Sequence, residues 1–225
     1  MIMEKGLLKD ALVKFIGGVV IIAALLFVPA GTMSWANGWI FMVVLFVPMF
    51  IAGIIMYKKA PDLLRSRLRA KESQSEQKSV IRLSGLMFLA AFIIAGLNFR
   101  FGWIGMPSWI VTAGIIIFIL SYCVFGEVLR ENAYLSRTIE VREGQEVVDT
   151  GLYGIVRHPM YSATVLLFLS MPLILGSPVS FVIMLLYIPI IVKRIRNEET
   201  VLEAELAGYK EYKQKVRFRL IPLVW

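Results

Sequence analysis

Residues 161–192 read YSATVLLFLSMPLILGSPVSFVIMLLYIPIIV and contain no charged side chain. This apolar run is longer than the roughly 20 residues that one simple helix needs to cross a bilayer. The Gly-Ser-Pro sequence at 176–178 interrupts the run near its middle and is typical of a turn. We therefore expect a helical hairpin in the membrane, with arms at 161–175 and 179–192.

Four further apolar runs precede this hairpin, at residues 11–28, 36–56, 83–97 and 108–125. The first run is too long for the hydrophobic region of a signal peptide and is followed by a poor cleavage site, so we interpret it as a retained span. The sequence predicts an all-α integral membrane protein with four N-terminal transmembrane helices plus the C-terminal hairpin. Six crossings would place both termini on one side.

The composition of the whole chain agrees with this fold class. Of its 225 residues, 58% are hydrophobic and 18% are charged, whereas soluble domains are about 45–50% apolar and about 25% charged. This excludes a soluble globular enzyme and a disordered chain. The net charge of +8 is explained by basic loops rather than by binding to nucleic acid.

Loop charges predict how the protein is oriented. The loop at 57–82 carries eight basic and three acidic residues, and the tail from residue 193 carries eight basic and five acidic residues. The segment 126–160 is also charged, whereas the loops at 30–35 and 98–107 and the tip of the hairpin carry almost no charge. By the positive-inside rule the charged segments face the cytoplasm. We expect a multi-pass protein of a prokaryotic inner or plasma membrane, with both termini and the functional site cytoplasmic.

The chain divides into two predicted regions. Residues 1–125 form a four-span membrane region with the basic cytosolic loop 57–82. Residues 126–225 form a core that contains a polar motif, the hairpin 161–192 and a cytosolic tail helix. The charged segments on either side of the hairpin are brought together by it, so we expect the functional site there.

The segment before the hairpin ends in Arg157-His158-Pro159. Proline suits the first position of a helix and the histidine suits the N-cap beside it. The N-terminus of a helix favours an anionic group, and Arg157 adds a fixed positive charge. The alternative interpretation is a membrane-entry turn, in which the arginine reaches lipid phosphate and neighbouring tyrosines anchor the interface.

The segment after the hairpin places Arg194 and Glu198 one helical turn apart, on a shared face. Such a carboxylate can bind an amine or ribose hydroxyls, and such an arginine can hold a substrate carboxylate. The alternative interpretation is a solvated salt pair worth a few tenths of a kcal/mol.

Residues 150–161, TGLYGIVRHPMY, resemble the signature of the isoprenylcysteine carboxyl methyltransferase family, which belongs to a wider group with the phospholipid N-methyltransferases. The tail, from Arg194 through Glu198-Glu199 to Leu220-Ile221-Pro222, resembles the C-terminal pattern of that family. The resemblance implies S-adenosyl-L-methionine as cofactor, bound in a cytosolic pocket between motif and tail. It implies carboxyl O-methylation of a lipophilic acceptor, isoprenoid-like or lipid, which enters from the bilayer.

The resemblance also implies roles for individual residues. Arg194 would hold the acceptor group and Glu198 would contact the cofactor, and we take these two as the catalytic pair. The residues expected to bind the cofactor are Gln145, Glu146, Val147, Val148, Gly151, Tyr153, Arg157, His158, Pro159, Met160, Tyr161, Glu198 and Glu199.

Two other functions fit parts of the sequence. Sterol-type membrane reductases share an Arg-His-Pro-like hairpin and use NADPH, but their tails usually carry a more Cys- and Asp-rich pattern than the Glu198-Glu199-x-x-Leu202 found here. A non-enzymatic transporter or assembly protein is the third possibility, although no charged residue lies deep in the first four runs. We expect no metal, because one histidine and one cysteine cannot form an ordinary His/Cys zinc site.

Overall fold

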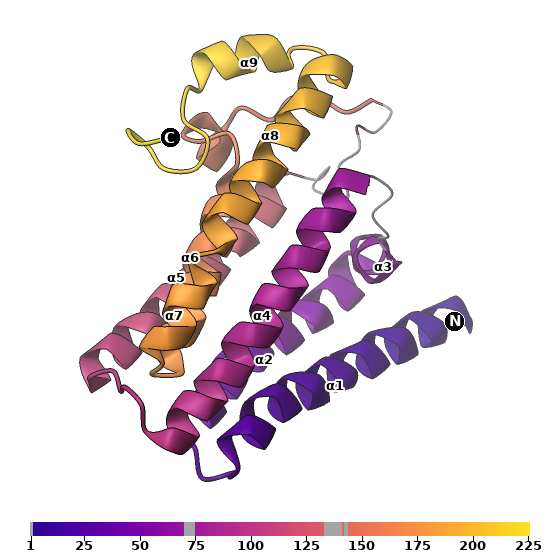
Figure 1. Cartoon of the computed structure of the whole chain (residues 1–225). Helices are drawn as coiled ribbons and strands as arrows, with labels where there is room; N and C mark the ends of the chain where they lie inside the picture. The colour runs from indigo at the N-terminus through magenta and orange to yellow at the C-terminus, as the bar shows by residue number, and fades with distance from the viewer. Residues whose placement is uncertain (1, 70–74, 133–140, 142–143) are drawn as a thin grey trace.

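The computed structural model describes residues 2–69, 75–132, 141 and 144–225 (Figure 1). Over these ranges the chain forms helices and connections, and no strand. This confirms the all-α membrane fold class. The helices are α1 (Ile2–Ala30), α2 (Ala36–Lys59), α3 (Pro61–Arg69), α4 (Ser75–Phe101), α5 (Ser108–Glu131), the 3-10 helix η1 (Gly151–Gly154), α6 (Pro159–Ile174), α7 (Pro178–Met184), α8 (Tyr187–Glu205) and α9 (Tyr209–Lys215).

Within the described residues, five helical stretches are long and apolar enough to cross a membrane. They are Gly6–Ala30, Ala36–Lys59, Lys78–Phe101, Ser108–Glu131 and Pro178–Glu205, the last comprising α7 and α8. Helix α6 is apolar but has only 16 residues, about 24 Å at 1.5 Å per residue. The first four stretches contain the four predicted N-terminal spans, and α6 to α8 form the predicted hairpin.

The structure differs from the sequence prediction at two places. The predicted loop 57–82 contains the short helix α3 and the first turns of α4, while residues 70–74 of it lie outside the description. The predicted arm 179–192 and the predicted tail helix are joined, because α8 continues from the apolar segment to Glu205. In both cases helix continues beyond the apolar residues that define a membrane span.

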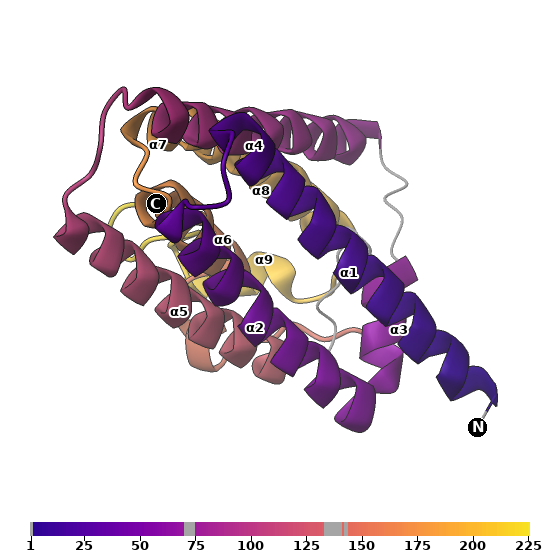
Figure 2. The same cartoon turned by 90° about the horizontal axis from the view of Figure 1, so that it is seen from below.

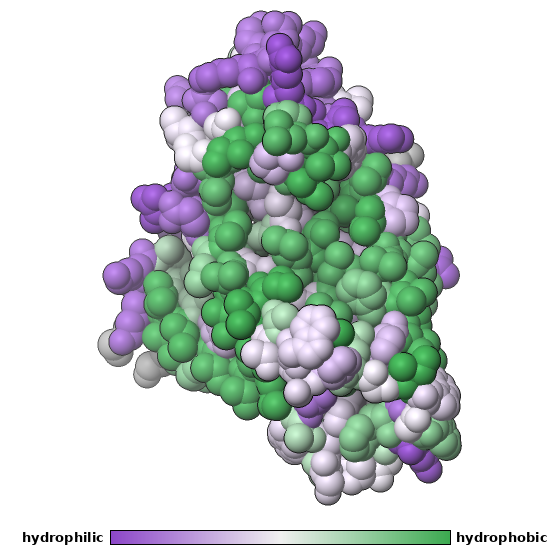
Figure 3. Space-filling view, turned by 90° about the vertical axis from the view of Figure 1, so that its left-hand side faces the viewer, coloured by the Kyte–Doolittle hydropathy of each residue, from purple (hydrophilic) through white to green (hydrophobic). Residues whose placement is uncertain are grey.

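The connections separate into two ends of the molecule (Figures 1 and 2). The α1–α2, α4–α5 and α6–α7 connections lie at one end, whereas α3, η1, α9 and the C-terminal tail lie at the other. The space-filling view shows a broad apolar band below a strongly charged end (Figure 3). We call the end that carries α9 the charged end.

Helix α6 lies in the centre of the bundle and packs along α5. The contact is close because Gly114 of α5 presents no side chain: a Cβ there would lie 2.8 Å from Leu173 Cβ. A second cluster joins α4, α6 and α8 through buried side chains that include Tyr161, Tyr187 and Ile191. These contacts fix the ends of α6 and α8 at the charged end.

Candidate active site

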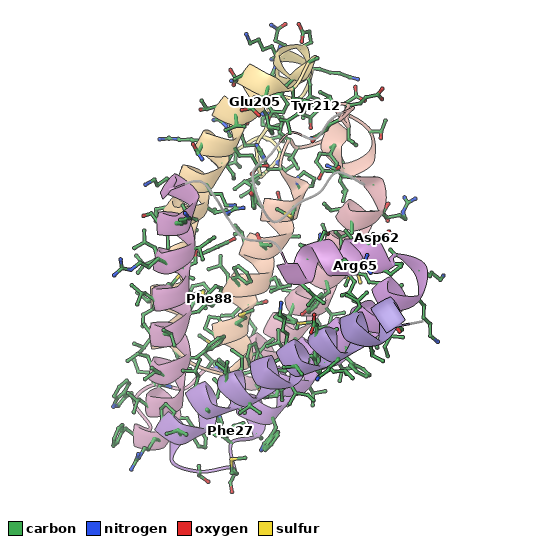
Figure 4. The ribbon with its side chains drawn as sticks, turned by 90° about the vertical axis from the view of Figure 1, so that its right-hand side faces the viewer. Phe27, Asp62, Arg65, Phe88, Glu205 and Tyr212 are labelled. Atoms are coloured by element: carbon green, nitrogen blue, oxygen red, sulfur yellow. The ribbon has the colours of Figure 1, made fainter. Side chains whose placement is uncertain are left out.

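The predicted motif and the tail meet at the charged end, where α6 begins and α8 approaches its last turns. Figure 4 shows Glu205 of α8 and Tyr212 of α9 at this end, opposite Phe27. Polar side chains from η1, α6, α8 and α9 are gathered here, partly beneath the C-terminal tail.

A buried ion pair forms the floor of the site. Arg157 Nε donates to Glu199 Oε1 at 2.7 Å, and both side chains are only 4% exposed. His158 Nε2 lies 3.2 Å from the same carboxylate oxygen, and Arg219 Nε donates to Glu199 Oε2 at 2.8 Å. The Glu199 carboxylate therefore has three polar partners, which compensate for its removal from water.

The same arginine binds the C-terminal tail. Arg157 Nη1 donates to the carbonyl oxygens of Val216 and Arg217, at 2.7 and 2.8 Å. The backbone N–H groups of Arg157 and His158 donate to the carbonyls of Phe218 and Arg219, both at 2.9 Å. The motif and the tail, about sixty residues apart, are thus one structural unit.

A second, half-buried set of residues lies beside this ion pair. The Tyr161 hydroxyl donates to Glu198 Oε2, and Arg194 Nε donates to that hydroxyl at 2.8 Å. The Arg194 guanidinium also lies 5.8 Å from the centre of the Tyr161 ring. Glu198 Oε1 is 4.0 Å from His158 Nδ1. Tyr161 of α6 therefore positions both residues that the sequence nominated as catalytic.

Helix η1 forms one side of the site. Asn132 Nδ2 donates to the Tyr153 hydroxyl at 3.0 Å, and the Tyr212 hydroxyl donates to the Tyr153 carbonyl at 2.7 Å. Burial raises the pKa of Tyr153 to about 12 and also raises the pKa of Tyr212. Both hydroxyls therefore keep their protons at neutral pH, and the Tyr212 proton is used in the hydrogen bond to the Tyr153 carbonyl.

The turn into η1 requires glycine. Gly151 has φ +53°, and a Cβ built on it would lie 1.6 Å from Glu131 Oε1. The Glu131 carboxylate accepts the Leu152 N–H, with Oε2 at 3.0 Å. The absence of a side chain at 151 lets the end of α5 anchor this turn.

Tyr209 at the start of α9 is the feature that sequence reasoning missed. Its side chain packs in a small cluster with Leu206, Tyr212 and Val216, against which Val147 also packs. The residue is 3% exposed, and its hydroxyl has no hydrogen-bond partner among the described residues. Burial raises the pKa of this hydroxyl, the carboxylates of Glu199 and Glu198 raise it further, and the charge of Arg157 lowers it. Tyr209 lies within the tail that resembles the family pattern, but the sequence assigned no role to its side chain.

The predicted site residues all lie in the described part of the chain. The structure gathers most of the polar ones: Tyr153, Arg157, His158, Tyr161, Arg194, Glu198 and Glu199. Pro159 begins α6 and is buried, and Met160 packs into the cluster beneath the site. Gln145, Glu146 and Val148 lie on the non-helical segment that leads to Gly151.

Comparisons with known proteins agree with this arrangement. Residues 112–204 match the model of the isoprenylcysteine carboxyl methyltransferase (ICMT) family. Among solved structures, the chain resembles the eukaryotic intramembrane Ras methyltransferase ICMT, solved without a monobody. The sequences are 17% identical, the TM-score is 0.51, and the match covers 96% of this chain and 86% of that one. No curated protein matches the chain by sequence.

The chain is thus a multi-pass, all-helical membrane protein that shares its fold with an intramembrane methyltransferase. Its residues 112–204, which include the motif and most of α8, are similar to the isoprenylcysteine carboxyl methyltransferase family. This match supports the family resemblance predicted from the motif and the tail.

Proposed function

We propose that this protein is an S-adenosyl-L-methionine-dependent methyltransferase that methylates a carboxylate on a lipophilic acceptor at the membrane surface. The observation that carries the proposal is the arrangement of Tyr161, Arg194 and Glu198 at the charged end of the membrane bundle. It places a cation and a carboxylate side by side on a rigid support, where an apolar molecule in the bilayer and a polar cofactor in water can meet.

The residues present fit the proposed cofactor. Its ammonium group and ribose hydroxyls need acceptors, and the half-buried carboxylate of Glu198 offers one. The unpartnered Tyr209 hydroxyl fits a further polar group, because a buried hydroxyl without a partner costs about 1–3 kcal/mol. The start of α6 at Pro159 suits a carboxylate. When bound, the cofactor supplies a methyl group on a positively charged sulfur, which is electrophilic without further activation.

Arg194 is our candidate for holding the acceptor. Its Nε donates to the Tyr161 hydroxyl, and a planar guanidinium matches the geometry of a carboxylate better than an ammonium group does. A carboxylate acceptor is already a nucleophile, so these residues need only orient it and exclude water. An amine acceptor would need a base, for which Glu198 and His158 are the nearest candidates.

The Arg157–Glu199 pair has a positioning role in this proposal. Both side chains are buried, and their partners include His158, Arg219 and the backbone of the tail. We propose that they hold His158 and the tail in place while Glu198 contacts the cofactor. The basic residues of α3 and of the tail further support a cytoplasmic location for the charged end.

Calorimetric titration of the detergent-purified protein with S-adenosylhomocysteine tests the cofactor, with NADPH titrated beside it. We expect saturable one-to-one binding of the nucleoside, weakened by Glu198→Gln, because an amide accepts from a cation less strongly than a carboxylate does. Binding of NADPH instead would assign the protein to the reductases. Binding of neither compound would remove the support for an enzyme.

A transfer assay tests the acceptor. We expect a radiolabelled methyl group to pass to an S-prenylated cysteine with a free carboxylate, and not to the matching carboxamide. Arg194→Lys should raise KM for the acid while leaving affinity for S-adenosylhomocysteine unchanged, because lysine lacks the planar fork. Transfer to a phospholipid amine would replace carboxyl O-methylation with N-methylation.

A further inference from the structure

A cavity of about 620 Å³ lies between α1, α2 and α3. Its interior is apolar and includes Leu12, Phe15, Phe50, Ile54 and Leu68. Its size falls in the range of small-molecule sites, about 300–1,000 Å³. None of its lining residues belongs to the candidate active site.

Helix α3 closes the cavity at the charged end. In Figure 4 this helix carries the labelled residues Asp62 and Arg65 and lies beside α1. Leu64 is buried in the packing, and the Lys14 ammonium donates to the Leu68 carbonyl. The Arg67 guanidinium lies 5.9 Å from the centre of the Phe125 ring of α5. Contacts to both α1 and α5 therefore hold α3 in place.

The charged groups that line the cavity all have the same sign. They are Lys14, Lys58 and Arg67, and no acidic residue in the described part of the chain lines it. The lysines come from the parts of α1 and α2 nearest α3, where the apolar band meets the charged end. An apolar interior beneath a cationic rim is complementary to an acidic headgroup with an acyl chain, and basic pockets between membrane helices bind such lipids.

We propose that this cavity binds one anionic phospholipid of the bilayer, with an acyl chain against α1 and α2 and its phosphate at Lys14 and Lys58. The inference rests on the lining of the cavity and the sign of its rim. It does not depend on the proposed methyltransferase activity.

Gly53 provides a variant that fills the cavity. It lines the cavity, and a Cβ built on it would meet no atom within 4 Å, so leucine can occupy that space. Leucine is also a better helix former than glycine, so the fold should tolerate the change. The matched control is Gly85→Leu in α4, where the space beside the glycine is equally open and no part of the cavity is touched.

The test is native mass spectrometry of the full chain with phosphatidylglycerol, and with phosphatidylcholine of the same acyl chains. We expect one tightly bound phosphatidylglycerol on the wild type and on Gly85→Leu. Gly53→Leu should weaken binding about tenfold or more, because excluding even two methylene groups has that effect. Lys58→Gln should weaken binding about fivefold, the effect of one basic residue near an acidic lipid.

Two results would overturn the proposal. Equal retention of both lipids would show that the rim charge does not select the headgroup. Unchanged phosphatidylglycerol binding in Gly53→Leu would place the lipid elsewhere on the surface. Thermal unfolding of each variant without lipid identifies a misfolded one, and Lys58→Gln, an exposed change, then decides the question.

Discussion

Glu198 and Glu199 are adjacent in sequence but have different surroundings. Glu199 is buried and bonded to Arg157, His158 and Arg219, whereas the Glu198 side chain is 22% exposed and accepts from Tyr161. One helical step of about 100° is enough to turn one carboxylate toward the buried ion pair and the other toward the proposed cofactor. The structure thus supports separate roles for the two residues.

This difference predicts opposite results for two conservative substitutions. Glu199→Gln leaves the buried Arg157 without its counter-charge and should destabilise the protein by about 3–5 kcal/mol. Glu198→Gln should change stability by less than about 1 kcal/mol while weakening binding of S-adenosylhomocysteine. Thermal unfolding and calorimetry of both variants check this. Equal loss of stability in the two would contradict the division of roles.

Tyr209 and Tyr212 allow a similar comparison within α9. Tyr209→Phe removes a hydroxyl that has no partner, so the ligand-free protein should be as stable as before or more stable. Tyr212→Phe removes the hydrogen bond to the Tyr153 carbonyl and should cost about 1 kcal/mol.

The affinity for S-adenosylhomocysteine should instead depend on the Tyr209 hydroxyl. Tyr209→Phe should weaken S-adenosylhomocysteine binding about two- to tenfold, the effect of one lost hydrogen bond. Unfolding temperatures measured with and without the nucleoside give both quantities. A destabilised Tyr209→Phe protein with unchanged affinity would make that tyrosine purely structural.

At the scale of helices, hydropathy predicted the spans because a bilayer demands about twenty apolar residues for each crossing. Helix α3 was missed because its leucines, of which only Leu64 is buried, are interspersed with charged residues and because it has only nine residues. The polar first turns of α4 were missed for a related reason. Hydropathy marks only the part of a helix that lies in the lipid, and α4 extends beyond that part. The hairpin was predicted because its Gly-Ser-Pro turn is visible in the sequence.

The candidate site was predicted only in part, and the reason is physical. Arg157, His158 and Glu198 could be nominated because their side chains carry recognisable chemistry at a family-typical spacing. The carbonyls of Val216 and Arg217 bind Arg157 as firmly, but every residue has a carbonyl, so the sequence does not mark these two. Tyr209 could be nominated only after the structure showed that its side chain is buried and that its hydroxyl has no hydrogen-bond partner among the described residues.

The crossing of α1 and α4 yields a prediction at the scale of helices. A Cβ on Gly96 would lie 2.6 Å from the Leu26 backbone oxygen, so Gly96→Ala must push the two helices apart. We expect a loss of about 1–3 kcal/mol, typical of overpacking. Gly85→Ala in the same helix meets open space and should be neutral or stabilising. Thermal unfolding of the pair in one detergent compares them, and equal stability would show that the crossing can relax.

At the scale of the whole molecule, the C-terminal tail joins the ends of the bundle to the site. Its carbonyls accept from Arg157 and His158, the Leu220 carbonyl accepts from Ser162 at 2.6 Å, and Arg219 lies 5.1 Å from the Trp225 ring centre. The tail therefore closes the site, and its Leu220 also packs in the cluster between α4, α6 and α8.

Removal of residues 216–225 should separate these functions. We expect the truncated chain to lose S-adenosylhomocysteine binding, because Arg157 loses both carbonyl acceptors and Glu199 loses Arg219. The membrane helices should persist, since the larger apolar cluster between them contains no residue of the tail. Calorimetry together with circular dichroism tests this, and retained affinity would show that the tail is dispensable.

Helix α8 has a consequence for how the protein responds to its surroundings. It runs without a break from Tyr187, in the apolar band, to the turns that carry Arg194 and Glu198. A helix adjusts to a thinner or thicker bilayer by changing its tilt, and a rigid rod transmits that tilt along its whole length. A change in the thickness of the surrounding bilayer, which its acyl chains set, should therefore shift Arg194 and Glu198 at the charged end.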